Sequence, residues 1–282
     1  MIETQTKEEL REHLKDWRRA GDHIAIVPTM GNLHDGHLKL VEIAREHAER
    51  VVVTIFVNPT QFGDGEDFED YPRTMERDRR RLKRARADLL FSPTVEVIYP
   101  FGVDTAASVT VPVLTDDFCG ESRPGHFDGV TGVVSRLFSL VQPDVAVFGQ
   151  KDYQQLLVIK RLVDDMSIPL EIVAAPTERE DDGLAMSSRN QYLTEDERAV
   201  APELFRALST VARALEAGDE NFTELEAQAI ATLEKAGFEP EYVSIRRAEN
   251  LEPPVRASDE LVVMAAAQLG AARLIDNVLV HV

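Results

Sequence analysis

Short apolar runs alternate with longer amphipathic segments up to about residue 175, and this alternation constrains the fold more than any other feature. Residues 24–27 and 51–57 are two such runs, and their apolar side chains occupy consecutive positions rather than every second one. A strand with this pattern is covered on both faces, as in a parallel sheet with helices on each side. We therefore predict an α/β fold with a doubly wound parallel sheet.

The other elements of this half follow from the same patterns. Thr6 and Glu9 have the spacing of a capping box, which predicts a helix that ends near Gly21. Further helices are expected over residues 36–49, 74–87, 130–141 and 153–164, and further strands over 88–91, 108–111, 145–148 and 171–173.

The pattern changes after Gly183. Two long helical stretches, residues 194–215 and 223–236, precede strand-like segments at 242–245, 261–267 and 273–280. We predict two domains: residues 1–182, with the parallel sheet, and residues 183–282, a smaller α+β domain.

Charge and composition exclude several classes of partner. The net charge is −19, from 31 basic and 50 acidic side chains, and such a surface repels nucleic acid and anionic membranes. No apolar run is long enough to span a membrane, and the first residues are charged, so we expect neither a membrane anchor nor a signal peptide. The single cysteine, Cys119, cannot form an intrachain disulfide, which favours a cytoplasmic location.

The acidic surplus leaves two hypotheses open, adaptation to high salt or an ordinary acidic bacterial enzyme. Activity and melting temperature measured from low to molar salt distinguish them. A maximum at low salt excludes the first.

Two histidines, His34 and His37, follow the run at residues 24–27 and a turn that contains Gly31. At a helix start, residues i and i+3 share one face, so both rings can approach one ligand. Helix N-termini also favour phosphate groups. A phosphate site is the favoured interpretation, with a structural cap and a metal site as alternatives; the metal site lacks an evident third ligand.

Polar side chains also follow two other predicted strands. Asn58 and Gln61 come after residues 51–57, where neutral amides suit hydroxyl and carboxylate recognition, although an ordinary Asn-Pro turn explains them equally well. Gly149 ends the strand at 145–148, and Lys151 and Asp152 then open a helix. Lysine is rare in this chain and is a natural phosphate partner.

A fourth polar group lies at residues 183–190. Ser187, Ser188 and Arg189 place two hydroxyls and a guanidinium in a row, which could hold a polyphosphate. Taken alone, a polar linker between domains is the simpler explanation.

Taken together, these segments resemble the pantoate–β-alanine ligase family of the HIGH-motif nucleotidylyltransferase superfamily. Residues 28–37, Pro-Thr-Met-Gly-Asn-Leu-His-Asp-Gly-His, are similar to the HIGH motif. The other family signatures follow in family order at residues 56–62, 71–74, 123–127, 149–155 and 186–190.

The resemblance implies a Rossmann-like N-terminal domain that binds ATP and pantoate, a C-terminal lid and a cytoplasmic homodimer. It implies that pantoate attacks the α-phosphorus of ATP to give pantoyl adenylate and pyrophosphate. β-Alanine then displaces AMP to give pantothenate. A related nucleotidylyltransferase acting on another small acid or phosphate is the alternative.

The resemblance also implies residue roles. Those expected to act in catalysis are His34, His37, Lys151 and Arg189. The expected ATP-binding residues are Met30, His34, His37, Gly149, Lys151, Asp152, Glu178, Met186, Ser187, Ser188 and Arg189. Pantoate and β-alanine are assigned to Asn58, Gln61 and Gln155, and Mg²⁺ to the ATP oxygens with help from Asp78. Glu178 departs from the family pattern, because an apolar residue is expected beside the base.

Overall fold

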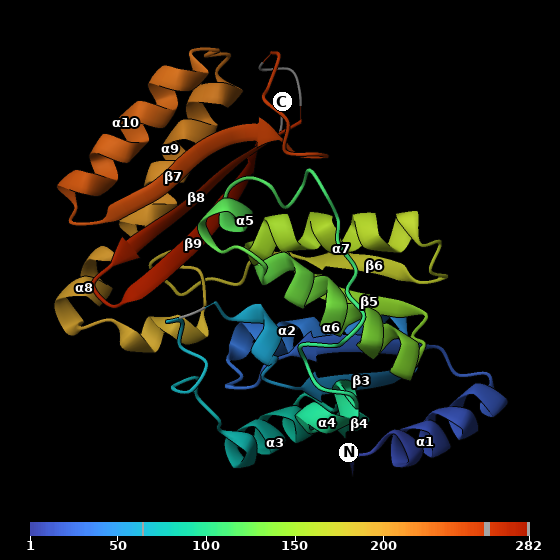
Figure 1. Ribbon diagram of the computed structural model, residues 1–282. Coiled ribbons are helices and arrows are strands. Elements are labelled where there is room, and N and C mark those ends of the chain that lie inside the picture. The colour runs from blue at the N-terminus through green and yellow to red at the C-terminus, as the bar shows by residue number, and fades with distance from the viewer. Residues whose placement is uncertain (64, 257–259, 281–282) are drawn as a thin grey trace. The chain divides into compact units, whose positions relative to one another are not determined.

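The structure is a computed structural model that describes residues 1–63, 65–256 and 260–280 (Figure 1). It divides into two compact units, one made of Met1–Gln150 and Val158–Pro176 and the other of Lys151–Leu157 and Thr177–Val282. The second unit thus begins before the predicted boundary at residue 183. It also includes the first turn of helix α7 (Tyr153–Asp165). Each unit is described by itself.

The first unit contains a six-stranded sheet in the order β1-β4-β3-β2-β5-β6, in which every neighbouring pair is parallel. The predicted parallel sheet is therefore confirmed. Its strands are β1 (Ile2–Thr4), β2 (Ile24–Thr29), β3 (Arg50–Ile55), β4 (Leu89–Phe91), β5 (Val145–Gly149) and β6 (Glu171–Ala175).

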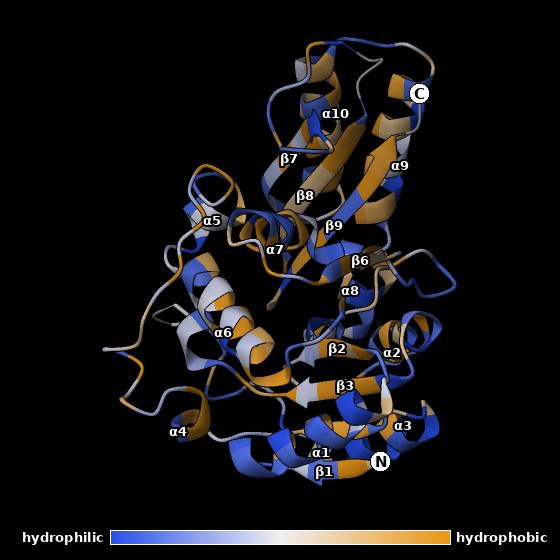
Figure 2. Cartoon of the chain, turned by 90° about the vertical axis from the view of Figure 1, so that its right-hand side faces the viewer, coloured by the Kyte–Doolittle hydropathy of each residue, from blue (hydrophilic) through white to orange (hydrophobic). Residues whose placement is uncertain are grey.

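Helices cover this sheet on both faces, as the continuous apolar strands predicted. Figure 2 shows α2 and α6 on opposite sides of β2 and β3. Helix α2 buries Val41 and Ala44 in one core together with Leu82 of α3. The helices and 3-10 turns of this part of the chain are α1 (Lys7–Ala20), α2 (Asp35–His47), η1 (Pro59–Gln61), α3 (Met75–Arg84), α4 (Val95–Ile98), α5 (Cys119–Ser122), α6 (His126–Val141), η2 (Gln150–Asp152) and α7 (Tyr153–Asp165).

The second unit contains a three-stranded antiparallel sheet in the order β7-β8-β9. Leucines and alanines of two helices, α9 and α10, share one core with alternate residues of these strands, as expected for a sheet covered on one face. The elements are η3 (Ser188–Tyr192), α8 (Glu195–Val200), α9 (Glu203–Glu216), α10 (Phe222–Lys235), β7 (Glu239–Arg247), β8 (Leu261–Leu269) and β9 (Ala272–Val280).

Two predicted elements are wrong. Residues 108–111 form no strand, because none of the described strands lies beside them to pair with; the Val109 carbonyl accepts the Thr131 hydroxyl instead. The single helix expected over 194–215 is split into α8 and α9 at Pro202, which has no N–H to continue a helix.

Candidate functional site

The strand order of the first unit reverses at β2. The chain adds β3 and β4 on one side of β2 and later β5 and β6 on the other. Ligands of open parallel sheets bind beyond the carboxyl ends of the strands at such a reversal. Strand β2 ends directly before Met30, and β5 ends at Gly149. The topology therefore brings Met30 and Gly149 to the same edge of the sheet.

His34 and His37 meet at the first turn of α2, as their spacing predicted. The ring centroids are 4.0 Å apart, and the backbone N–H of His34 donates to Nδ1 of His37 at 3.3 Å. A neutral ring with an accepting Nδ1 carries its proton on Nε2, which is then the nitrogen that can donate to an anion. Capping at Nδ1 and phosphate binding at Nε2 are therefore compatible. Among the described residues, no group of three His, Cys, Asp or Glu side chains could hold a metal ion.

Asp78 of α3 holds the loop that carries these histidines. Its carboxylate accepts the backbone N–H groups of Asn32 and Leu33, both at 2.9 Å, and it is 1% exposed. Gly31 beside it has a φ of +84°, and a Cβ there would lie 3.0 Å from a methyl carbon of Ile55, so only glycine suits this position. Both Asp78 oxygens already accept protein N–H groups, and its predicted help with Mg²⁺ stays a prediction.

Asn58 and Gln61 are joined to each other after β3. Nδ2 of Asn58 donates to Oε1 of Gln61 at 2.9 Å and to the Gly129 carbonyl at 3.1 Å. Oδ1 of Asn58 accepts the hydroxyl groups of Tyr99 and Thr60, and the residue is 0% exposed. Asn58 therefore fixes the side chain of Gln61, while its own predicted contact with substrate stays a prediction.

The backbone of Gln61 is held from the other side by Arg123 and His126. Nη2 of Arg123 lies 3.2 Å from the Gln61 carbonyl, and Nδ1 of His126 lies 2.8 Å from it. Arg123 also forms two hydrogen bonds with the carboxylate of Glu66. Burial raises the pKa of Glu66, but the hydrogen bonds and charge of Arg123 outweigh it, so this pKa lies below its ordinary value.

In the second unit, β9 and the loop after β7 hold the segment that begins at Lys151. Nδ2 of Asn277 donates to the Lys151 carbonyl at 2.9 Å. The Tyr153 hydroxyl donates to the Ala248 carbonyl at 2.8 Å, and burial raises the pKa of Tyr153 to about 12. These contacts explain why the first turn of α7 belongs to this unit.

A short hairpin at residues 178–186 leads into the serine-containing segment. The N–H of Met186 donates to the Glu178 carbonyl at 2.9 Å, while the Glu178 side chain is exposed. Ser187 then caps η3, because its Oγ accepts the N–H of Arg189 at 3.2 Å. The conformation of this segment is thus determined locally, by a hairpin and a cap.

The predicted site residues fall into two sets, one in each unit. The first unit holds Met30, His34, His37, Asn58, Gln61, Asp78 and Gly149. The second holds Lys151, Asp152, Gln155, Glu178, Met186, Ser187, Ser188 and Arg189.

The prediction from sequence missed the residues that hold these sets in place. In the first unit they are Arg123 and His126, which lie in the family signature at residues 123–127 but were given no role. In the second they are Asp276 and Asn277, two adjacent polar residues within an apolar strand, a pattern that could have identified them.

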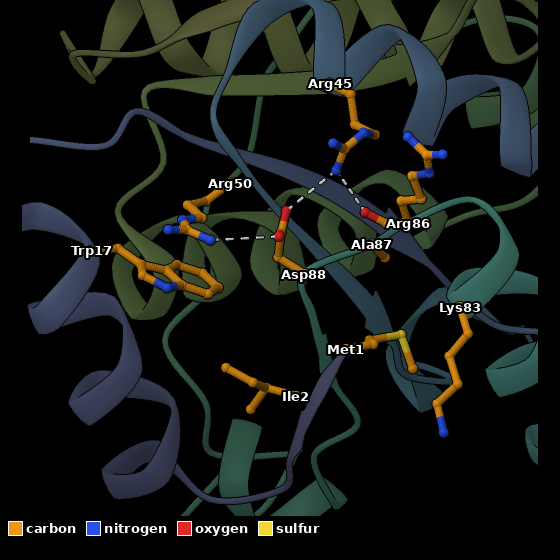
Figure 3. Close-up of a pocket in the computed structure, with 9 residues that line it drawn as sticks. All are labelled: Met1, Ile2, Trp17, Arg45, Arg50, Lys83, Arg86, Ala87 and Asp88. Carbon is orange, nitrogen blue, oxygen red and sulfur yellow. Dashed lines mark hydrogen bonds and ion pairs between the residues drawn. The ribbon is translucent and has the colours of Figure 1, made fainter. Parts of the chain in front are cut away.

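A pocket of about 450 Å³ lies elsewhere in the first unit, near the amino ends of β1, β3 and β4. In Figure 3, Arg45 and Arg50 both reach Asp88, and Arg50 lies over the ring of Trp17. A third cation, Lys83, pairs with Glu3 at 3.5 Å. Because most of its positive charge is paired, and it lies at the edge opposite the carboxyl ends, we do not assign ATP to this pocket.

Comparisons with known sequences give one consistent result. A family model described as pantoate-beta-alanine ligase matches residues 3–279. A pantothenate synthetase of Pseudomonas fluorescens (strain SBW25) is 51% identical over 277 residues, which are 98% of this chain and 98% of the relative. Another, from Aeromonas hydrophila, is 54% identical over 268 residues, which are 95% and 94% of the two chains.

Solved structures agree with the sequence comparisons. The crystal structure of a pantothenate synthetase from Thermus thermophilus is similar with a TM-score of 0.92 and 46% identity, over 99% of both chains. A pantoate-beta-alanine ligase from Francisella tularensis, complexed with beta-gamma ATP and beta-alanine, has a TM-score of 0.82 and 32% identity, over 99% of this chain and 97% of the other.

Proposed function

The chain belongs to the pantoate–β-alanine ligase family and is a ligase that uses ATP to join pantoate to β-alanine, and we propose that it does so through a pantoyl adenylate. A pantoate carboxylate oxygen attacks the α-phosphorus, and pyrophosphate leaves. The β-alanine amine then attacks the acyl carbon, and AMP leaves with that oxygen. A carboxylate needs no base to act as a nucleophile at neutral pH, so the first step depends on positioning and on charge stabilisation.

The observation that carries this proposal is the paired arrangement of His34 and His37 at the start of α2. Helix N–H groups and the Nε2–H of His37 supply donors for phosphate oxygens, and Nδ1 is already held by the backbone of His34. We assign both histidines to stabilising the charge that develops as pyrophosphate departs, with His37 as the proton donor.

The remaining phosphate donors come from Lys151, Ser187, Ser188 and Arg189. Lys151 is assigned to the transferring phosphoryl group and the other three to the β- and γ-phosphates. Removal of one preorganised donor of this kind costs on the order of 100-fold in rate. Residues assigned to the rest of the nucleotide are Met30, Gly149, Asp152, Glu178 and Met186.

Gln61 and Gln155 are assigned to pantoate. Oε1 of Gln61 is engaged by Asn58, so Gln61 presents its amide N–H₂, a donor that suits a carboxylate or hydroxyl oxygen. We place Asn58 behind Gln61 rather than against the substrate. Gln61 also serves the incoming β-alanine.

Mg²⁺ is proposed as the counter-ion of ATP. The described residues provide no group of three ligands for it, and both Asp78 oxygens accept backbone N–H groups. The part of the chain that the structure describes thus offers no cage of its own, and Mg²⁺ would be held through phosphate oxygens.

We further infer a cytoplasmic homodimer. ATP as co-substrate favours the cytoplasm. Support for the dimer comes from residues 108–111 and their neighbours. Residues 108–111 have the composition of a strand, but none of the described strands pairs with them. The side chains of Phe101 and Val113 nearby are 88% and 72% exposed, as apolar residues of a subunit interface would be in a single chain. Light scattering in solution tests this point, and a monomer mass at micromolar concentration contradicts it.

Product analysis with ATP, β-alanine and pantoate labelled with ¹⁸O in its carboxylate tests the proposal. The adenylate route transfers one labelled oxygen to AMP and supports exchange of labelled pyrophosphate into ATP when only pantoate is added. Unlabelled AMP, or no exchange, would overturn the intermediate. A stable nucleotidyl product without AMP release would favour the related nucleotidylyltransferase.

A further inference from the structure

Strand β9 places Asp276 and Asn277 next to each other among apolar residues. They are 3% and 6% exposed. The pairing of β9 with β8 is regular and antiparallel, so consecutive side chains point to opposite faces of the small sheet. A buried carboxylate and a buried amide each cost free energy unless they are hydrogen-bonded, and their partners are therefore informative.

Asn277 holds the backbone of Lys151. Its Nδ2 donates to the Lys151 carbonyl at 2.9 Å, between residues 126 positions apart in the sequence. Lys151 lies in η2, the 3-10 turn directly before α7. The bond therefore fixes the backbone of Lys151, from which the side chain extends. It does not contact the ammonium group itself.

Asp276 fixes β9 from the other face. Both of its oxygens accept hydrogen bonds from the guanidinium of Arg179, at 2.6 and 2.9 Å. Arg179 also donates to the Gly183 carbonyl and lies 3.8 Å from the ring centroid of Phe205. Burial raises the pKa of Asp276, while the charges of Arg179 and Lys151 oppose that shift. The strand that carries Asn277 is thus tied to the hairpin at 178–186.

The two tied segments share one small cavity. It is lined by Lys151, Ser187, Asn190 and Asp276, together with apolar residues of α9 and β9. Asn190 donates to the Ala185 carbonyl at 3.1 Å, which joins the serine-containing segment to the same hairpin. The lysine and the serine assigned to ATP phosphates are therefore placed by one buried network.

We propose that Asn277 is a positioning residue for the reaction, which acts by holding the Lys151 backbone so that the ammonium group meets the transferring phosphoryl group. This inference rests on the proposed function, because it takes Lys151 as a phosphate-binding residue. Strand β9 contributes no predicted substrate contact. Through Asn277, however, it would affect the rate of adenylate formation.

A double-mutant cycle tests the proposal. Pantoate-dependent exchange of labelled pyrophosphate into ATP is measured for the wild type, Asn277→Ala, Lys151→Ala and the double variant. Asn277→Ala should lower the exchange kcat by about 10- to 100-fold, the range caused by small misplacements, and leave the KM for pantoate within about twofold. In the Lys151→Ala background, the same change should alter the rate by less than about twofold, because residues that act through one another are not additive.

Controls separate positioning from general damage. Gln228→Ala removes an exposed amide of the same unit, bonded to Glu224 within α10, and should change neither rate nor melting temperature. Should Asn277→Ala not fold, Asn277→Leu keeps the branched side-chain shape and removes the donor without adding a buried charge, and the same kinetic pattern is expected. Equal losses in both backgrounds, or a wild-type rate for a folded variant, would overturn the proposal. Absence of pantothenate from the wild type would instead overturn the proposed function.

Discussion

Nδ2 of Asn58 donates to Oε1 of Gln61 at 2.9 Å, and this contact determines which end of the Gln61 amide can meet a ligand. Oδ1 of the same Asn58 accepts the buried hydroxyl of Tyr99 at 2.8 Å. One buried side chain therefore orients the residue assigned to pantoate and also accepts a hydrogen bond from a buried tyrosine.

Replacing Asn58 with alanine should weaken pantoate binding and destabilise the fold. The KM for pantoate should rise about 10-fold, equivalent to one hydrogen bond of about 1.4 kcal/mol, because Gln61 loses its fixed orientation. The free energy of unfolding should fall by about 1–3 kcal/mol, since the buried Tyr99 hydroxyl loses the Asn58 acceptor and the Gly129 carbonyl loses its Asn58 donor. Steady-state kinetics and urea unfolding measure the two effects. An unchanged KM in a folded variant, or a further tenfold rise when the change is added to Gln61→Ala, would contradict the role.

Asp78 should act as a clamp on the loop between β2 and α2. In Asp78→Asn, one amide N–H₂ faces a backbone N–H of Asn32 or Leu33, so one hydrogen bond becomes a repulsion. We expect a loss of about 1–3 kcal/mol in the free energy of unfolding and an adenylation rate about 10-fold lower or more, because His34 and His37 are displaced. Urea unfolding and pyrophosphate exchange measure these changes.

The dependence of the Asp78→Asn adenylation rate on Mg²⁺ concentration shows whether Asp78 holds the loop or binds the metal ion. If Asp78 binds the ion, a higher concentration of Mg²⁺ at fixed ATP should restore the rate of Asp78→Asn. If it clamps the loop, the rate should stay low from 1 to about 20 mM Mg²⁺, concentrations chosen to span ordinary affinities for this ion. Recovery at high Mg²⁺ would therefore support the role predicted from the sequence.

The elements that sequence predicted well are those with a local signal. The capping box at Thr6 and Glu9 starts α1 as expected, and the consecutive apolar residues of β3 are buried. Strand β1, only Ile2–Thr4, was missed because three residues show no periodicity. Residues 108–111 were wrongly predicted as a strand because β-branched composition does not show whether a neighbouring strand exists.

Local geometry was predictable where a motif is continuous in sequence, as in the meeting of the His34 and His37 rings. The supports were not predictable, because they join distant positions. Asp78 meets Leu33 from 45 residues away, and Asn277 meets Lys151 from 126 residues away. The resemblance assigns Asp78 to Mg²⁺ and Asn58 to substrate, and both roles stay predictions; the sequence does not reveal that atoms of these side chains already have protein partners.

The ion pair of Glu66 and Arg123 should make stability depend on acid pH. The folded-state pKa of Glu66 lies below the ordinary value of 4.5. A lowered carboxyl pKa stabilises the fold above the unfolded-state pKa, and this contribution is lost as the pH falls through the folded-state pKa. Glu66→Gln should therefore be less stable than the wild type at pH 7, by about 1 kcal/mol for a half-buried pair, and the difference should shrink below about pH 4.5.

Urea unfolding at pH 7, 5, 4 and 3 measures the contribution of Glu66. The exposed Glu239 provides a control with the same change in charge, and Glu239→Gln should follow the wild type at each pH. A difference for Glu66→Gln that persists unchanged at pH 3 would show that the carboxylate charge does not stabilise this loop.

The hairpin at residues 178–186 should require glycine at position 183 for two reasons, the positive φ and the closeness of the Phe205 ring. Gly218 shares the first reason only, so a comparison of the two glycines separates them. The φ of Gly183 is +98°, and a Cβ there would lie 2.7 Å from a ring carbon of Phe205. Gly218 has a similar φ of +88°, but a Cβ there meets nothing within 4 Å. Gly218→Ala should therefore cost only the backbone strain, about 1 kcal/mol.

Gly183→Ala should cost that strain and a displacement of the Phe205 ring as well, in total about 2–4 kcal/mol of the free energy of unfolding. Because the ring lies against Arg179, its displacement should also loosen the ion pair with Asp276. Adding Phe205→Leu to Gly183→Ala should recover the part due to the clash, whereas it should recover nothing when added to Gly218→Ala. Equal urea midpoints for the two glycine variants would show that the hairpin tip yields without disturbing the ring.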